Sequence, residues 1–254
     1  MDRTQETLVV ERFGQRAAAY LGSAVHASGG DLAALAALVA ARPGCRVLDL
    51  GCGGGHVAYA AAEAGAGEVV ACDLSADMLA VVDAEASRRG LRAIRTEQGS
   101  AERLPFDTGA FDVVLSRYSA HHWHDFEAGV REAARVLKPS GVAGFADAVS
   151  AMPGANDTFL QAVELLRDTS HVRDRSVAEW LDATGRAGLS ARTTTAGRAR
   201  MEFASWIARI ATPPEMVAAI RALQVAVSDD VRAHYEVEPD GSFTIDTATM
   251  VFAP

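Results

Sequence analysis

The stretch Arg46-Val47-Leu48-Asp49-Leu50-Gly51-Cys52-Gly53-Gly54-Gly55 decides the fold. Its first half predicts a short buried strand over 47–50. The glycines that follow predict a turn, because glycine has no Cβ and readily adopts positive φ. A helix is expected over 56–64. A strand, a glycine-rich loop and a helix form the first unit of a doubly wound α/β sheet, which binds its ligand beyond the carboxyl ends of its strands.

The second strand of this unit is expected over 68–73 and ends in an acidic residue. That residue, Asp73, lies 22 positions after Gly51 (73 − 51). There a carboxylate can accept hydrogen bonds from both hydroxyls of a ribose, each worth about 1.5–3 kcal/mol because the acceptor is charged. The spacing therefore predicts a nucleoside ligand. An NAD-type oxidoreductase is one alternative, but a dinucleotide-binding loop would have a glycine at the sixth position, where this chain has His56.

The loop carries a second acidic residue, in the pattern Asp49-x-Gly51-x-Gly53-x-Gly55. This pattern resembles motif I of the class I S-adenosylmethionine-dependent methyltransferases. From 46 to 147 the chain is similar to their ubiquinone/menaquinone C-methyltransferase-like group, through the segments 48–55, 101–106 and 135–141. The segments 119–125 and 167–173 resemble a bacterial subgroup of this family. The resemblance implies methyl transfer with S-adenosyl-L-methionine as cofactor. It does not imply that this chain acts on the quinone precursors that are the substrates of that group.

The resemblance also implies which residues contact the cofactor. They are Asp49, Gly51, Gly53, Asp73, Ser100, Ala101 and Ser116. Ser100 stands where the family usually has an acidic residue that accepts from the adenine amine, and a serine hydroxyl can accept the same hydrogen bond. Ala101 can offer its backbone N–H to the ring. Leu74 and Met78 are placed to sandwich the adenine, since methionine fits irregular apolar surfaces, although core packing is the alternative for Met78.

The first 44 residues are predicted to be mostly helical. Phe13 and Tyr20 lie seven positions apart (20 − 13), so they share one helix face. Either this face packs on the sheet, or the segment forms a lid in which Tyr20 and His26 close over the cofactor. Asp31 is the expected N-cap of a helix over 32–41.

Length and composition predict one methyltransferase domain. With 254 residues the chain can bury roughly 70–75% of its unfolded surface. A net charge of −9 disfavours nucleic-acid partners. The three cysteines are expected to be buried hydrophobes, and together with the lack of a charged-then-apolar leader they indicate a reducing cytoplasm. The longest apolar run, over 32–41, is about half a membrane span, so no membrane span is expected.

The predicted fold class is α/β: a Rossmann-like sheet of seven mostly parallel strands with an antiparallel last strand, helices on both faces and a small helical cap. The expected division of residues 1–254 is a helical lid over 1–44, a cofactor-binding core over 45–147, and the remaining strands with a substrate cap over 148–254. The cap is expected within 148–185 and 203–236, and the last strand over 242–252.

Catalytic residues are expected directly after the fourth strand, predicted over 111–116. Methyl transfer is an in-line displacement, and alignment of the reactants can supply about 7–11 kcal/mol. A phenol or an activated carbon must also lose a proton, which a histidine can accept. His121 and His122 follow the strand, and His171 is a further candidate, with Arg117 able to bind an anionic group of the substrate. A mechanism by alignment alone, without a base, is the alternative.

No metal site is expected, because the cluster of His121, His122 and His124 beside Asp125 lacks the spacing of known ligand sets. The predicted acceptor is a small molecule, methylated on carbon or oxygen, such as a quinone precursor or another phenolic or carboxylic metabolite. Carboxyl methylation of an acyl-carrier substrate and a non-catalytic cofactor-binding protein are the alternatives. The sequence sets neither the acceptor nor the oligomeric state.

Overall fold

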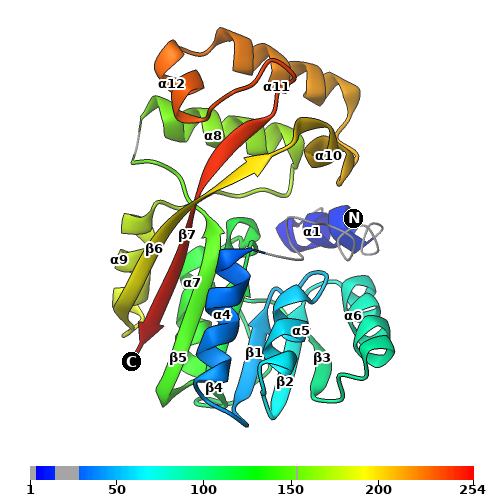
Figure 1. The fold of residues 1–254 in the computed structure, drawn as a ribbon, viewed down its shortest axis with the longest axis vertical. Helices are drawn as coiled ribbons and strands as arrows, with labels where there is room; N and C mark the ends of the chain where they lie inside the picture. The colour runs from blue at the N-terminus through cyan, green and yellow to red at the C-terminus, as the bar shows by residue number, and fades with distance from the viewer. Residues whose placement is uncertain (1–3, 15–28, 153) are drawn as a thin grey trace.

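A seven-stranded sheet runs through the computed structural model, which describes residues 4–14, 29–152 and 154–254 (Figure 1). In their order across the sheet the strands are β3 (Ile94–Gln98), β2 (Glu68–Asp73), β1 (Arg46–Leu50), β4 (Phe111–Arg117), β5 (Leu137–Ala148), β7 (Phe243–Ala253) and β6 (Ser190–Met201). Strands β1 to β5 pair in parallel, whereas β7 is antiparallel to both β5 and β6. The predicted fold class is confirmed.

Helices cover both faces of the sheet. One face carries α4 (Gly30–Ala40), α5 (His56–Glu63) and α6 (Ala76–Arg89), and the other carries α7 (Phe126–Val136) and α9 (Val177–Arg186). The inner strands β1, β2, β4 and β5 are mostly buried on both sides, because successive side chains point to opposite faces and helices cover both. In β1, for example, Val47 packs with the first set of helices and Leu48 with the second.

Side-chain caps start two of these helices, α6 and α7. The Ser75 hydroxyl accepts from the Met78 N–H at 3.3 Å, and Asp125 accepts from the Ala128 N–H at 2.9 Å. The predicted cap of α4 is wrong. That helix has Gly29 at its N-cap position with no side-chain hydrogen bond. Asp31 instead pairs with Arg117 at the end of β4.

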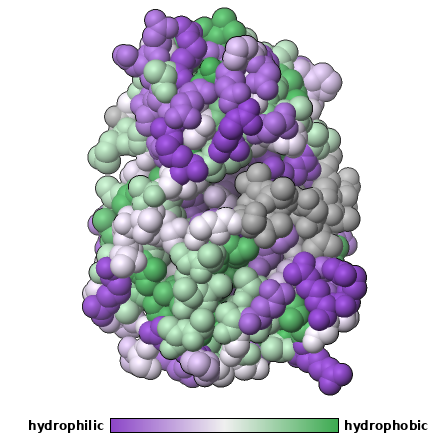
Figure 2. Space-filling view, in the orientation of Figure 1, coloured by the Kyte–Doolittle hydropathy of each residue, from purple (hydrophilic) through white to green (hydrophobic). Residues whose placement is uncertain are grey.

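The cap is built on the two long strands at the sheet edge. The pairing of β5 with β7 ends at Ala148, and β6 and β7 continue past it as a two-stranded ribbon (Figure 1). The helices around this ribbon are α8 (Ala155–Arg167), α10 (Phe203–Ala208), α11 (Pro214–Ala226) and α12 (Asp229–His234). They share an apolar core with it, and Figure 2 shows hydrophilic side chains over their outer surface at the top of the molecule.

The segment expected to form the first part of the cap is divided between two places. Helix α8 belongs to the cap, but α9 packs on the sheet. Trp180 of α9 lies with its ring 4.7 Å from that of Phe126 and 5.0 Å from that of Phe145, centroid to centroid. Since Trp180 is almost fully buried in the core of the sheet, the prediction of a cap over all of 148–185 is wrong for α9.

Helix α1 (Gln5–Gly14) lies between the core and the cap (Figure 1). The two residues predicted to close a lid, Tyr20 and His26, lie outside the described residues. Within the part of the chain that is described, no helix is both long and apolar enough to span a bilayer.

Candidate active site

The turn after β1 needs its glycines for two reasons. Gly51, Gly53 and Gly55 have φ values of +69°, +48° and +81°, which side chains with a Cβ rarely adopt. In addition, a Cβ on Gly51 would lie 1.9 Å from the Ser119 hydroxyl. The turn is therefore packed tightly at its first glycine.

Asp73 at the end of β2 holds this turn in place. Its Oδ2 accepts from the Gly53 N–H at 2.9 Å, and its Oδ1 accepts from the Ser75 N–H at 2.9 Å. A carboxylate has about four acceptor positions, so each oxygen keeps capacity for a ligand. Burial raises the pKa of Asp73, although hydrogen bonds from the N–H groups of Ser75, Gly53 and Leu74 oppose this shift.

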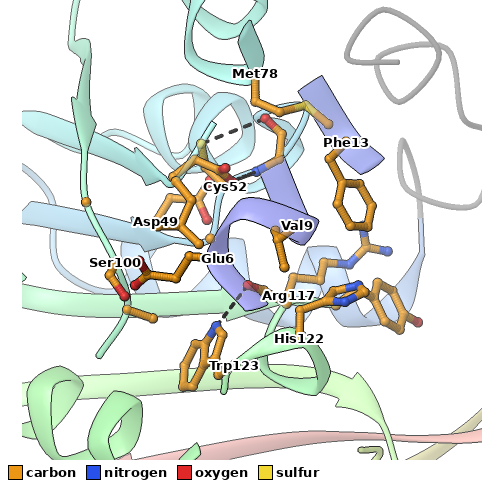
Figure 3. Close-up of a pocket in the computed structure, with 18 of the residues that line it drawn as sticks. Glu6, Val9, Phe13, Asp49, Cys52, Met78, Ser100, Arg117, His122 and Trp123 are labelled. Atoms are coloured by element: carbon orange, nitrogen blue, oxygen red, sulfur yellow. Dashed lines mark hydrogen bonds between the residues drawn. The ribbon is translucent and has the colours of Figure 1, made fainter. Parts of the chain in front are cut away.

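The turn and Asp73 line the larger of two adjoining cavities, which we call the cofactor pocket (Figure 3). With its open mouth it encloses about 1080 Å³. The structure brings together on its wall eight of the residues predicted to bind the cofactor, namely Asp49, Gly51, Gly53, Asp73, Leu74, Met78, Ser100 and Ala101. These residues come from three separate segments, which follow β1, β2 and β3 and meet at the carboxyl ends of these strands.

Asp49 provides a test of which ligand fits this pocket. Its Oδ2 accepts from the Ala58 N–H at 2.9 Å, but its Oδ1 is buried and has no hydrogen-bond partner among the described residues. Burial raises the pKa of Asp49 to about 7, and the charge of Asp73 adds to the shift. A buried carboxylate without a partner favours a cationic ligand, which fits the amino group and the sulfonium of S-adenosylmethionine.

The loop after β3 also lines the cofactor pocket, through Ser100, Ala101 and Glu102. The Ser100 hydroxyl accepts a long hydrogen bond of 3.4 Å from the Glu102 N–H. Glu102 in turn accepts from the Asp125 N–H at 3.0 Å, which ties the loop to the start of α7. These hydrogen bonds hold the loop as part of the wall of the cofactor pocket.

Two predicted site residues have other partners. The Ser116 hydroxyl donates to the carbonyl oxygen of Leu50 at 2.7 Å and is buried between β4 and β1. It is not among the residues that line the cofactor pocket, so the structure does not support a contact of its side chain with the ligand. Arg117 lines the pocket, but its Nε donates to Asp31 at 2.6 Å. Its role in binding an anionic group of the substrate stays a prediction, and Asp31 already pairs with this guanidinium.

Several residues of the pocket were not predicted. Gln5, Glu6, Val9 and Phe13 line it from α1, and Figure 3 shows Val9 and Phe13 on the side of this helix that faces the pocket. Their spacing of four positions is typical of one helix face, which was a usable signal. For Ser119, whose hydroxyl accepts from the Trp123 indole at 3.2 Å, the sequence contains no comparable signal.

A second cavity, which we call the acceptor pocket, adjoins the first on the side of the cap. It encloses about 590 Å³ with its open mouth. Phe13, Tyr118 and His122 line both pockets. The remaining walls are His121, Ala148, Glu164, Arg167, Asp174, Met201, Trp206, Arg209 and Ile245. The acceptor pocket thus combines apolar and aromatic surface with charged groups of both signs.

The three predicted catalytic histidines lie close together but differ in their surroundings. The Nδ1 of His121 is 2.6 Å from Oδ1 of Asp147. Burial opposes the charged form of His121, but the charge and hydrogen bond of Asp147 outweigh it and raise the pKa to about 9. Burial lowers the pKa of His122 to about 4, with a contribution from His121. Since His122 places Nδ1 at 3.1 Å from the Ser170 carbonyl oxygen, the proton of its neutral form lies on Nδ1 and the lone pair on Nε2.

His171 does not line either pocket. Its Nε2 lies 3.0 Å from Oε1 of Gln161. Burial, reinforced by His121 and His122, lowers its pKa to about 2. The structure therefore places His171 behind the acceptor pocket and not on its wall.

Comparison with known proteins gives the class. The family model described as a methyltransferase domain matches residues 48–145. The methyltransferase YcgJ of Bacillus subtilis is 34% identical over 80% of each chain. Its crystal structure superimposes with a TM-score of 0.83 at 31% identity, covering 87% of this chain and 97% of that one. With this fold and site, the chain belongs to the class I S-adenosylmethionine-dependent methyltransferases.

Two further relatives differ in how far the likeness extends. The Escherichia coli protein YafE is 48% identical over 70% of this chain and 86% of its own length. The demethylmenaquinone methyltransferase of Lactococcus lactis is 36% identical, but over only 39% of this chain and 40% of its own. The protein is thus an S-adenosylmethionine-dependent methyltransferase and not an NAD-type oxidoreductase.

Proposed function

We propose that this methyltransferase acts on a small molecule bound in the acceptor pocket, on an oxygen or on a carbon activated by a neighbouring oxygen. The observation that carries the proposal is the shared wall of Phe13, Tyr118 and His122. Two cavities with a common wall allow a methyl donor in one to meet a nucleophile in the other. Such an arrangement supplies the alignment on which methyl transfer depends.

The walls of the acceptor pocket favour a flat or apolar molecule with a polar end. Trp206 and Met201 supply apolar surface, and Trp206 is overlaid by the guanidinium of Arg167 at 5.0 Å. Arg167 also lies 3.7 Å from the Glu164 carboxylate. Phenolic and carboxylic metabolites, including quinone precursors, combine these properties.

The cofactor residues act by holding the methyl donor in place. Asp73 would accept from the ribose hydroxyls, and the open oxygen of Asp49 would face the cationic amino-acid end. Leu74 and Met78 would enclose the adenine beside Ser100. When bound, S-adenosylmethionine supplies an electrophilic methyl group on a sulfonium.

His122 is our candidate for the general base. The hydrogen bond of its Nδ1 to the Ser170 carbonyl fixes the ring and leaves the Nε2 lone pair to take a proton. An acceptor oxygen forms the new bond to the methyl carbon, the electrons of the broken C–S bond stay on sulfur, and the acceptor proton passes to Nε2. The products are the methylated acceptor and S-adenosylhomocysteine.

A product screen tests this proposal. The full chain is incubated with S-adenosylmethionine carrying a labelled methyl group and with panels of phenols, hydroxy acids, carboxylates and amines. We expect S-adenosylhomocysteine and a labelled product in equal amounts from a phenolic or carboxylic acceptor. Transfer to amines alone, or none to any panel at saturating cofactor, would contradict it.

A further inference from the structure

Three segments that are far apart in the sequence bring two carboxylates and an imidazole together, and two of these side chains, His121 and Asp174, line the acceptor pocket. His121 lies after β4, Asp147 near the end of β5, and Asp174 in the loop between α8 and α9. One ligand atom from each side chain lies within 4.8 Å of the other two. Both aspartates are at least 95% buried, since Asp147 is 4% and Asp174 1% exposed.

Hydrogen bonds of its backbone fix the position of Asp174. Its backbone N–H donates to Oε1 of Gln161 at 3.0 Å, and its carbonyl accepts from the same side chain at 2.8 Å. The preceding residues, Val172 and Arg173, donate their N–H groups to the carbonyl of His121 at 2.8 and 3.2 Å. The loop is therefore fixed against His121 through its backbone.

One oxygen of the Asp174 carboxylate, Oδ2, is buried and nevertheless lacks a hydrogen-bond partner among the described residues. The Nε2 of His171 lies 3.9 Å from it, beyond hydrogen-bond distance. An ion pair between His121 and Asp147 accounts for the carboxylate of Asp147 but not for this oxygen. A buried polar atom without a partner calls for a ligand.

We propose that His121, Asp147 and Asp174 hold a divalent first-row transition-metal ion at the wall of the acceptor pocket, where the ion binds an oxygen of the acceptor. One imidazole and two carboxylates suit Mn²⁺, Fe²⁺, Co²⁺ or Zn²⁺. Ligand atoms at about 2.0–2.2 Å from an ion are at most about 4.4 Å apart. The observed spread of 4.8 Å therefore needs a shift of only a few tenths of an ångström.

The role of the ion rests on the proposed function, whereas its binding does not. A metal ion lowers the pKa of a hydroxyl bound to it, so an acceptor hydroxyl there would lose its proton more readily to His122. Because the ion binds oxygen, the pocket should also bind acceptors that carry an oxygen more tightly than neutral apolar ones.

Metal binding is measured without acceptor or cofactor. The full chain is freed of metal with EDTA, exchanged into clean buffer and titrated with MnCl₂, and free Mn²⁺ is followed by electron paramagnetic resonance. We expect one ion per chain. Asp174→Asn and His121→Asn should each weaken binding by about tenfold or more, whereas Asp182→Asn, at an exposed site on α9, should leave it unchanged.

Calorimetry with S-adenosylhomocysteine checks that the variants fold, because neither His121 nor Asp174 lines the cofactor pocket. If Asp174→Asn does not fold, Mn²⁺ binding is compared between the wild type and His121→Asn alone. No bound Mn²⁺ in the wild type, or equal binding in both variants, overturns the metal site. Methyl transfer by a chain that binds no metal would leave the proposed function standing and remove only the ion.

Discussion

Arg117 donates from Nε to Oδ2 of Asp31 at 2.6 Å, which joins two residues 86 positions apart. A second contact, from Nη2 to Oδ1 at 3.1 Å, makes the pair bidentate. The side chain of Arg117 is only 4% exposed and that of Asp31 18%. The pair therefore attaches α4 to the carboxyl end of β4, next to the cofactor pocket.

We expect this pair to contribute to folding stability. Removing one partner of a buried pair leaves an uncompensated charge and costs about 3–5 kcal/mol. Asp31→Asn should therefore lower the free energy of unfolding measured in urea, and Asp31→Asn with Arg117→Gln should cost less than the sum of the two single changes. Strict additivity would show that the two side chains do not stabilise each other. Asp83→Asn, on the exposed side of α6, is the control.

Asp73 should decide cofactor affinity. Each lost hydrogen bond to a charged acceptor costs about 1.5–3 kcal/mol, so Asp73→Ala should weaken S-adenosylhomocysteine binding by tenfold or more in calorimetry. Asp83→Asn again serves as control, since Asp83 contacts Thr96 and lies outside the pocket. Equal affinity of the wild type and Asp73→Ala would remove Asp73 from the cofactor site.

The glycine turn offers a matched pair of substitutions. Gly51 and Gly53 both have positive φ, but a Cβ on Gly53 meets open space and one on Gly51 meets Ser119 at 1.9 Å. Gly53→Ala should therefore cost only the conformational term of about 1–2 kcal/mol, and Gly51→Ala should cost more. Urea unfolding of the two variants without ligand measures the difference, and equal losses would show that the contact with Ser119 relaxes freely.

Asp49 should make stability depend on pH. Burial raises its pKa from 3.8 to about 7 in the folded chain, so the folded state holds this proton more tightly than the unfolded state. Its contribution to stability is therefore full below pH 3.8 and declines as the pH rises towards about 7. As the pH rises from 5 to 8, the free energy of unfolding should therefore fall less in Asp49→Asn than in the wild type. Parallel profiles for the two proteins would contradict this assignment.

His122 is expected to affect turnover more than binding. His122→Gln should lower kcat by about 10²–10⁴-fold, the usual contribution of a general base, and should leave S-adenosylhomocysteine affinity within a few-fold of the wild type. His124→Gln is the matched control, because His124 lines the cofactor pocket but not the acceptor pocket. Equal rates for His122→Gln and the wild type would favour transfer by alignment alone.

The local part of this protein could be predicted from its sequence. The strand that ends at Leu50, the glycine turn and the acidic end of β2 are set by neighbouring residues, through hydrophobic runs and through positive φ values that only glycine adopts easily. The same holds for the caps at Ser75 and Asp125. These features predicted the sheet and the class of cofactor, which the fold and the comparisons confirmed.

Contacts between distant segments could not be predicted in this way. Asp31 has the sequence context of a helix cap, yet the packing of α4 places it against Arg117. Ser116 matches the family pattern, yet its hydroxyl faces the neighbouring strand. His171 was grouped with His121 and His122 by type, but its contact with Gln161 places it behind the acceptor pocket.

By itself the sequence determined the first strands of the sheet, the cofactor turn and the methyltransferase class, because each depends on residues close together along the chain. Only the tertiary structure decided which charges meet at the acceptor pocket. His121, Asp147 and Asp174 come from three separate elements, and no spacing in the sequence relates them. Their meeting depends on how the cap and its loop pack against the end of the sheet.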